Sequence, residues 1–250
     1  MSDILSVVAS ALRADQSKLE QSSLNAANAA TPGYKRASLV AQSFDQVLGA
    51  QQSTGAAHKS GDTWRAPTYV LNKVTDFSAG ALQQTGRALD VAVEGKGFLQ
   101  LTNGTQTWLT RTASLQVNAQ GDLVGPKGLR VVGDLGELRA GGDKGLSISA
   151  SGELQRGDQV LGRIKLVVPA DDSALNSSDG VLFEASQDQL QDAPPDQGVI
   201  RAGFLEGSNT SNLKEMLGVM ESVRHFESLI RLAQGYDEVM GRAIQKLGEG

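Results

Sequence analysis

The chain has 250 residues, a length that suits one large or two modest domains. Its 23 Lys and Arg stand against 28 Asp and Glu, and the formal net charge of −5 disfavours nucleic-acid binding. The absence of cysteine excludes disulfides, thiolate catalysis and cysteine-type zinc sites, and two histidines make a multi-histidine metal site hard to build. We therefore predict that the protein holds no metal and no cofactor.

An N-terminal helical segment is predicted over residues 1–36, with Thr31-Pro32-Gly33 as its stop signal. The start has no basic region typical of a cleaved secretory signal, and no window approaches 18 apolar residues, so we expect neither signal cleavage nor membrane insertion. One face carries positions at a spacing of three and four, apolar apart from two polar interruptions. These positions are Leu5, Val8, Leu12, Asp15, Leu19, Ser22, Ala26 and Ala29.

Residues 37–67 shift to Gln, Ser, Thr, Gly and Ala with little periodicity, which predicts an extended or mobile connector. Residues 68–204 contain short alternating apolar runs between Gly and Asp, which indicates a central all-β domain. Residues 115–123 and 146–154 share the pattern Leu-x-aliphatic-x-Ala-x-Gly-acid-Leu. Because a glycine between two such runs supplies the positive φ of a hairpin loop, we predict two hairpins of the same construction.

The last segment, residues 205–250, predicts a long helix that begins at Asn212-Leu213-Lys214-Glu215, an Asn-x-x-Glu capping arrangement. From Leu213 to Leu247 it would be about 52 Å long at ~1.5 Å per residue. Internal glycines cost ~1 kcal/mol each against alanine, so this helix needs a partner. The spacing of three and four indicates a coiled-coil seam. Its positions are Met216, Val219, Val223, Phe226, Ile230, Ala233, Asp237, Met240, Ile244 and Leu247.

Asp15 and Asp237 interrupt the two apolar stripes. Either the predicted frame is one residue off and both face water, or they are polar seam residues that fix register and partner. In the second case, replacing either one by Leu should disturb assembly fidelity more than folding.

No sequence motif assigns a catalytic residue or a small-molecule substrate. Gly95-Lys96 lacks the earlier Gly and the following Ser or Thr of a phosphate-binding loop, and no Gly-x-Ser-x-Gly elbow occurs. His225 lies beside the seam, where a solvated or interface imidazole is expected, and His58 lies in the connector. An enzyme such as a carboxylate-based hydrolase is disfavoured, because the sequence places no acid pair together.

The predicted fold class is α+β, with terminal helices on either side of a central β domain. This arrangement brings both chain ends to one place, where the helices can pair with each other and with those of neighbouring subunits. Contacts between different surface patches propagate as a helical filament unless they close into a ring. We expect both helices to be loose in the free subunit and to order on assembly.

A family resemblance is carried by Asn25-Ala26-Ala27-Asn28-Ala29-Ala30-Thr31-Pro32-Gly33-Tyr34-Lys35. This run resembles the N-terminal signature of bacterial flagellar rod and hook proteins, although Ala26 stands where Leu or Ile is usual. Thr31, Pro32, Gly33 and Tyr34 are its motif turn. Residues 76–86, 89–93 and 95–98 are similar to the central signature of that family, and Thr110-Arg111 also fits. Leu205-Glu206-Gly207-Ser208-Asn209 and Arg224-His225-Phe226-Glu227 are most similar to the proximal-rod members.

The resemblance implies a structural subunit of the flagellar basal-body rod, the shaft that crosses the periplasm and serves motility. It implies copies of the chain and other rod proteins as partners, and export by the flagellar type III apparatus without signal cleavage. The terminal helices would form a coiled-coil-like inner tube, with Asn25 and Asn28 joining the N-terminal interface, and the β domain would lie outside.

Two alternatives remain open. One is a distal-rod or hook subunit of the same family. Deleting the gene and observing where assembly of the basal body stops would distinguish this alternative from a proximal-rod subunit. The other is a secreted adhesin, a binding module that predicts an exposed apolar or aromatic patch on the β domain.

Overall fold

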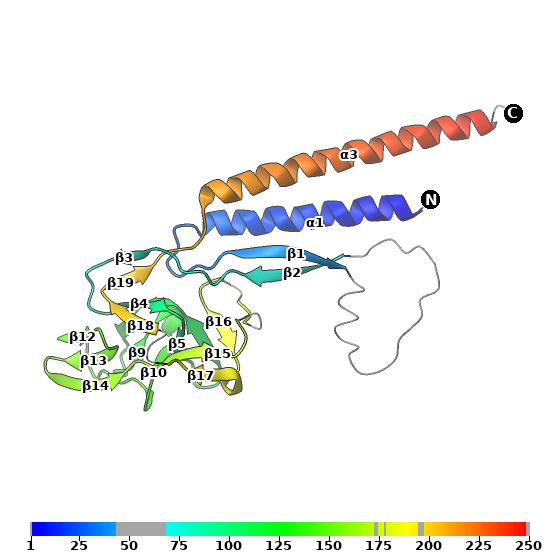
Figure 1. Ribbon diagram of the computed structural model, residues 1–250. Helices are drawn as coiled ribbons and strands as arrows, with labels where there is room; N and C mark the ends of the chain where they lie inside the picture. The colour runs from blue at the N-terminus through cyan, green and yellow to red at the C-terminus, as the bar shows by residue number, and fades with distance from the viewer. Residues whose placement is uncertain (1, 44–68, 173–174, 178, 195–197, 249–250) are drawn as a thin grey trace. The chain divides into compact units, whose positions relative to one another are not determined.

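The computed structural model describes residues 2–43, 69–172, 175–177, 179–194 and 198–248 (Figure 1). The chain divides into two units. The helix unit comprises residues 1–27, 37–74 and 211–250, and the β unit comprises residues 28–36 and 75–210. This mixture of helix and sheet agrees with the predicted α+β class. Most of the predicted connector, including His58, lies outside the described residues.

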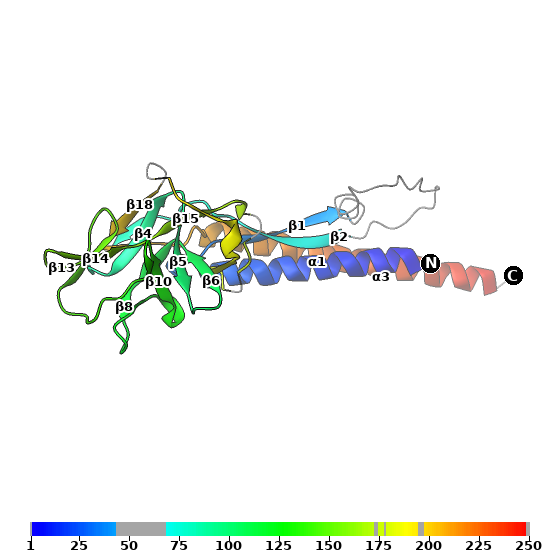
Figure 2. The ribbon, with the colours of Figure 1, turned by 90° about the horizontal axis from the view of Figure 1, so that it is seen from below.

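The helix unit contains an antiparallel helix pair, α1 (Ser2–Ala27) and α3 (Asn212–Gly248). It also contains a two-stranded ribbon of β1 (Ala37–Ser43) and β2 (Tyr69–Thr75), and β1 contacts α1. Both views show α1 and α3 side by side, with α3 extending past the start of α1 (Figures 1 and 2). In the described part of the chain, neither helix combines the length and the apolar character needed to cross a membrane.

Helix α1 ends earlier than the predicted stop signal, at Ala27. Pro32 has no N–H to donate to the Asn28 carbonyl, so a helical bond at this point cannot form. The Asn28 carbonyl instead accepts a turn hydrogen bond from the Thr31 N–H at 3.0 Å. Residues 28–36 consequently leave the helix and join the β unit.

The first residues of the predicted connector form an extended strand. Residues 37–43 form β1, which pairs with β2. The hydrogen-bonding partner of β1 lies more than 25 residues further along the chain, so a local reading of composition cannot detect the pairing.

The β unit is built from short antiparallel strands. Their bounds are β3 (Leu82–Gln84), β4 (Asp90–Gly95), β5 (Phe98–Thr102), β6 (Thr107–Thr110), β7 (Thr112–Ser114), β8 (Gln116–Val117), β9 (Leu123–Val124), β10 (Arg130–Gly133), β11 (Gly136–Glu137), β12 (Leu146–Ile148), β13 (Glu153–Arg156), β14 (Gln159–Arg163), β15 (Leu166–Pro169), β16 (Phe183–Ala185), β17 (Leu190–Asp192), β18 (Gly198–Ala202) and β19 (Phe204–Glu206). The largest sheet runs β16-β6-β5-β10-β9-β8, with β11, β15 and β17 attached. The smaller sheets are β12-β13-β14, β18-β4-β7 and β19-β3.

The core of the β unit lies along the central strands. Strand β4 is buried at four consecutive positions, and its Val91 and Val93 pack in one cluster with Leu99 and Leu101 of β5. A second cluster contains three phenylalanines in edge-to-face contact, with ring centroids 4.9 to 6.4 Å apart. They are Phe77, Phe98 and Phe183.

The two predicted hairpins are confirmed, as β8–β9 and β12–β13. Gly121 and Gly152 have φ of +83° and +78°, the left-handed region that the shared pattern requires. Each glycine N–H donates to the carbonyl three residues earlier, that of Asn118 or Ser149. The same local pattern therefore produces the same turn twice.

Candidate functional site: a buried ion cluster and an exposed helix face

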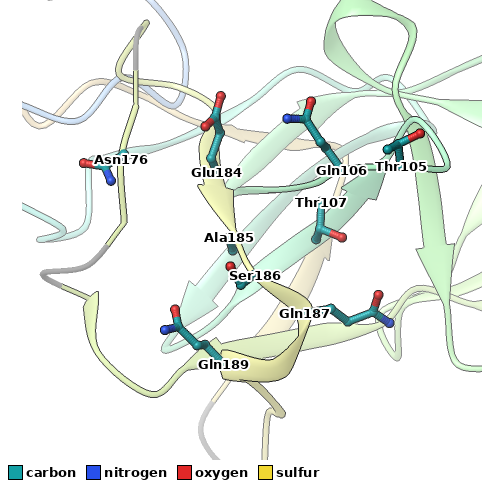
Figure 3. A pocket seen from close by; sticks show the side chains of 9 residues that line it. All are labelled: Thr105, Gln106, Thr107, Asn176, Glu184, Ala185, Ser186, Gln187 and Gln189. Atoms are coloured by element: carbon teal, nitrogen blue, oxygen red, sulfur yellow. The ribbon is translucent and has the colours of Figure 1, made fainter.

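The cavity drawn in Figure 3 is polar and has a volume of about 500 Å³. It is lined by Thr105, Gln106, Thr107, Asn176, Glu184, Ala185, Ser186, Gln187 and Gln189. All of these side chains except that of Ala185 can hydrogen-bond a polar molecule. However, the nine include no histidine or lysine that would activate a hydroxyl as a nucleophile. Among the described residues, no three His, Asp or Glu side chains gather where they could hold a metal ion.

Three buried charges from distant segments meet in the β unit. Lys35 follows the motif turn, Arg111 lies between β6 and β7, and Glu206 ends β19. Lys35 Nζ lies 2.6 Å from Glu206 Oε1, and Arg111 Nε lies 2.9 Å from Glu206 Oε2. All three side chains are at most 5% exposed. One carboxylate therefore ties together the chain just after α1, the middle of the β unit and the chain just before α3.

Backbone groups complete the Lys35–Arg111–Glu206 cluster. Lys35 Nζ donates to the Ser78 carbonyl at 2.7 Å, and Glu206 Oε1 accepts from the Gly80 N–H at 2.8 Å. The Arg111 guanidinium also donates to three carbonyl oxygens at 2.8 to 3.1 Å, those of Val93, Gly95 and Gly97. Buried charges lose their hydration, and hydrogen bonds of this number are needed to offset that cost.

The electrostatics of the cluster point to a structural role. Burial lowers the pKa of the Lys35 ammonium below its ordinary value, because the loss of hydration outweighs the attraction of Glu206. Glu206 is the carboxylate that contacts both cations, and the charge of Asp76 adds a weaker attraction for Lys35. Removing one partner of a buried pair costs about 3–5 kcal/mol, since the remaining charge is left uncompensated.

The motif turn packs tightly beside this cluster. Gly33 has a φ of +76°, and a Cβ there would lie 2.7 Å from Thr112 Cγ2. Tyr34 is buried, and a Cβ at Gly180 would lie 2.5 Å from Tyr34 Cε2. The Lys35 N–H donates to the Gly180 carbonyl at 2.8 Å. The motif turn is thus held inside the β unit.

We predict that Gly180→Ala destabilises the β unit more than Gly86→Ala. Both glycines have a φ of +72°, but a Cβ at Gly86 meets nothing within 4 Å. The left-handed conformation costs either alanine about 1–2 kcal/mol. Overlap with Tyr34 adds about 1–3 kcal/mol at Gly180 only. Urea denaturation of the two variants measures the difference, and equal losses would show that Tyr34 is not closely packed on Gly180.

The predicted N-terminal interface residues lie largely on the α1 face that packs on α3. Val8, Asp15 and Asn25 are buried, and Leu12 and Leu19 are half-buried. Asp15 Oδ2 lies 2.5 Å from His225 Nδ1, and Asn25 Nδ2 donates to Glu215 Oε2 at 3.2 Å. Asn28 belongs to the β unit, where its Oδ1 accepts from the Thr31 hydroxyl at 3.1 Å. The side chain of Leu5 lies outside the part that the structure describes.

The predicted seam of α3 divides between two faces. Val219, Phe226, Ala233 and Met240 are half-buried, whereas the alternate positions Met216, Val223, Ile230, Asp237 and Ile244 are exposed. The buried or half-buried face includes Glu215, Gly218, Ser222, Leu229 and Tyr236, so it is rotated from the predicted seam. The apolar arc of α3 is wider than α1 can cover. The side chain of Leu247 is outside the described part.

Exposed apolar side chains concentrate in the first turns of α3. We call five of them the outer stripe: Leu213, Met216, Leu217, Met220 and Val223, at 70%, 64%, 57%, 52% and 40% exposure. Positions three or four residues apart share a helix face, so these side chains form one continuous surface. Such a surface is typical of an interaction site.

Asp15 and Asp237 lie in different environments. Asp15 is 3% exposed and contacts His225 on α3, whereas Asp237 is exposed. Asp237 therefore faces water as the first interpretation expects, whereas Asp15 is buried, and a role of Asp15 in register stays a prediction.

The buried ion cluster is not predicted from the sequence. Lys35, Arg111 and Glu206 each stood in a motif that carried the family resemblance, but nothing in the sequence paired them. A signal was available, since Arg111 and Glu206 are single charges in short strand-forming runs, Thr-Arg-Thr and Phe-Leu-Glu. Charges at such positions are buried only when they are paired.

Comparison with known proteins finds matches over both units. A family model described as the flagellar hook protein FlgE/F/G D1 domain matches residues 92–181, and one described as the flagellar basal body rod FlgEFG protein C-terminal matches residues 201–246. The chain is 30% identical to the flagellar basal-body rod protein FlgF of Escherichia coli (strain K12) over 89% of each chain. It is 31% identical to FlgF of Salmonella typhimurium, also over 89% of each chain. FlgG of Bacillus subtilis (strain 168) is 26% identical over 92% of this chain and 93% of the relative.

These matches define the class as the structural proteins of the bacterial flagellar hook and rod. The chain belongs to the flagellar basal-body rod protein family and is a structural subunit of the rod in the basal body. The buried ion cluster and the helix pair are therefore features of a structural subunit.

Proposed function

We propose that the chain polymerises through α1 and α3, with copies of itself and with other rod proteins, in the proximal part of the rod. The observation that carries this proposal is the outer stripe of α3. Five large apolar side chains on one helix face are 40% to 70% exposed in the single chain. Contacts between this stripe and a different surface of a neighbour are heterologous, and they extend into a helical filament.

The distribution of exposed apolar side chains supports assembly through the helices over an adhesin role. Among the described residues, 12 of the 16 exposed large apolar side chains lie in the helix unit. The β unit contributes four, none of them aromatic. They are Leu82, Leu135, Val160 and Val199. An adhesin patch on the β unit would need the opposite distribution.

The energetics favour a filament with several neighbours per subunit. Fully burying a Leu, Val or Met side chain contributes about 1.5–3 kcal/mol, so a half-exposed one gains ~1 kcal/mol. The five residues of the outer stripe then gain ~5 kcal/mol in one contact, whereas association costs about 4–15 kcal/mol. A single contact is marginal, and a subunit in a filament makes several.

In the assembled rod we place the helix units in an inner tube and the β units outside. Close-packed side chains have low compressibility, and such a tube resists torsion between the motor and the hook. Export by the flagellar type III apparatus without signal cleavage completes the proposal. The similarity to FlgF relatives supports the proximal position. The test is to delete the gene and to observe where assembly of the basal body stops.

Limited proteolysis tests the polymerisation. Arg242 on α3 is 71% exposed in the single chain, and Arg139 on the β unit is 80% exposed. We expect assembly to slow trypsin cleavage after Arg242 at least about tenfold, because a neighbour covers α3, and to leave cleavage after Arg139 within about twofold. Mass spectrometry of the digested monomer and of the sedimented polymer measures both rates. If Arg242 is equally protected in the monomer and the polymer, the proposal fails.

A further inference from the structure

Three contacts between α1 and α3 share one register. Asp15 contacts His225, Asn25 contacts Glu215, and a Cβ at Gly218 would lie 3.7 Å from Ser22 Oγ. From Asp15 to Ser22 is seven residues forward on α1, and from His225 to Gly218 is seven residues back on α3. From Ser22 to Asn25 is three more residues on α1, and from Gly218 to Glu215 is three more residues on α3. The helices therefore keep one alignment along this stretch.

Two of these contacts are pairs of polar side chains, and three of the four residues in them are buried. Asp15, Asn25 and Glu215 are 3%, 1% and 1% exposed, so their polar groups depend on partners within the protein. Asn25 is also held by the backbone of Ala37, to which its Nδ2 donates at 2.8 Å. Burying such a group without its partner costs about 1–3 kcal/mol, and more for a charge.

Sliding α3 by one turn breaks both pairs. A shift of four residues puts either Glu221 or Leu229 opposite Asp15 in place of His225. The first sets two carboxylates against each other, and the second leaves a buried carboxylate facing a methyl group. The apolar contacts tolerate such a shift, because Leu, Val and Ala recur on both faces at helical spacing. Polar groups discriminate between registers where apolar groups do not.

The register also determines which part of α3 has no α1 residue opposite. If the same register is extended to the start of α1, Ser2 lies opposite about Glu238 of α3. Helix α3 continues beyond this point to Gly248. About ten residues of α3, or roughly 15 Å, therefore project past α1. Figure 2 shows α3 extending past the start of α1. Val239 and Ile244 in this projection are 62% and 65% exposed. The half-buried face that contacts α1 continues into the projection at Met240.

We propose that the Asp15–His225 and Asn25–Glu215 pairs fix the axial register of α3 on α1, and thereby the length of α3 that a second copy of this chain covers in the rod. The second half of this proposal rests on polymerisation through the helices. A second copy is the occupant because the projection continues the α1–α3 interface, so a surface like that of α1 fits it.

Engineered disulfides test the register, and the chain has no native cysteine to interfere. Ser22→Cys with Gly218→Cys reports the native register, because these positions lie within disulfide reach. Ser22→Cys with Ser222→Cys reports a shift of one turn. In the otherwise native, unassembled chain we expect the first pair to cross-link at least about tenfold faster than the second.

The test variant is Asp15→Leu/Glu215→Leu. His225 is 59% exposed, so water can replace Asp15 as its partner, and Asn25 keeps its two hydrogen bonds to the backbone of Ala37. The helices therefore stay paired, and we expect the cross-linking ratio to fall below about threefold. The matched control is Val8→Ala/Leu19→Ala, which removes apolar volume from the same face and should keep the ratio near tenfold.

The outcomes separate the two proposals. An unchanged ratio in Asp15→Leu/Glu215→Leu, or an equal fall in the control, overturns the register role. Filaments of the double variant should lose a regular subunit spacing in electron micrographs and lose protection after Arg242. If the ratio falls but spacing and protection persist, the second half is overturned. Because cross-linking is measured in unassembled chain, failure of the native chain to polymerise counts against the proposed function alone.

Discussion

Glu206→Gln is expected to lower the free energy of unfolding of the β unit by about 3–5 kcal/mol. The glutamine keeps the size of the side chain but removes the carboxylate that compensates both Lys35 and Arg111, at 2.6 and 2.9 Å. The two buried cations would then lose the carboxylate that contacts both of them. Urea denaturation monitored by circular dichroism of the full chain measures the loss.

The control for this experiment is Glu184→Gln, which removes the same charge from an exposed position on β16. It should change the unfolding free energy by no more than about 0.5 kcal/mol. The double variant Lys35→Met/Glu206→Gln should be less destabilised than the sum of its single variants, because removing both partners leaves one fewer uncompensated charge. A loss at Glu206 no larger than at Glu184 would mean that the cluster does not hold the β unit together.

Met216→Asp/Met220→Asp is expected to abolish polymerisation and swimming while leaving the monomer folded. Both side chains are more than half exposed, so the stability of the single chain should change by no more than about 1 kcal/mol. In a filament, each aspartate would be buried without a partner, at a cost of several kcal/mol. Each 1.4 kcal/mol is a factor of ten, so the concentration needed for assembly should rise more than about 100-fold.

Sedimentation of the purified chain and swimming of a complemented deletion strain are the two measurements. The matched control is Leu135→Asp, the same kind of change at a side chain that is 103% exposed on the β unit. It should assemble and swim normally if the helices carry the assembly. Normal assembly of the Met216→Asp/Met220→Asp variant would exclude the outer stripe as an interface. Loss of assembly with Leu135→Asp instead would move the interface to the β unit.

The sequence predicts best where structure depends on neighbours along the chain. The repeated pattern at residues 115–123 and 146–154 predicts both hairpins, because a positive-φ glycine between alternating runs acts over a few residues. The Asn-x-x-Glu arrangement likewise marks the start of α3, which begins at Asn212. Sequence prediction was weaker at β1, whose partner strand lies beyond residue 68.

The candidate site shows the same division. Periodicity identifies apolar arcs on both helices, but a spacing of three and four does not say which edge of a wide arc meets the partner. On α3, Val219 and Phe226 turn toward the interface while Met216 and Val223 stay exposed. The Lys35–Arg111–Glu206 cluster was unpredicted, because its three residues are more than 70 residues apart along the chain.

For this protein, composition and local pattern by themselves determined the α+β class, the terminal helices, the hairpins and the family signature. Each of these depends on torsion preferences, capping groups or hydrophobic periodicity within one short segment. Only the tertiary structure decided that Glu206 joins Lys35 to Arg111, that Asp15 meets His225 and that the outer stripe stays uncovered. Those outcomes depend on which side chains, far apart along the chain, are buried in contact with one another. Local sequence patterns do not specify such long-range contacts.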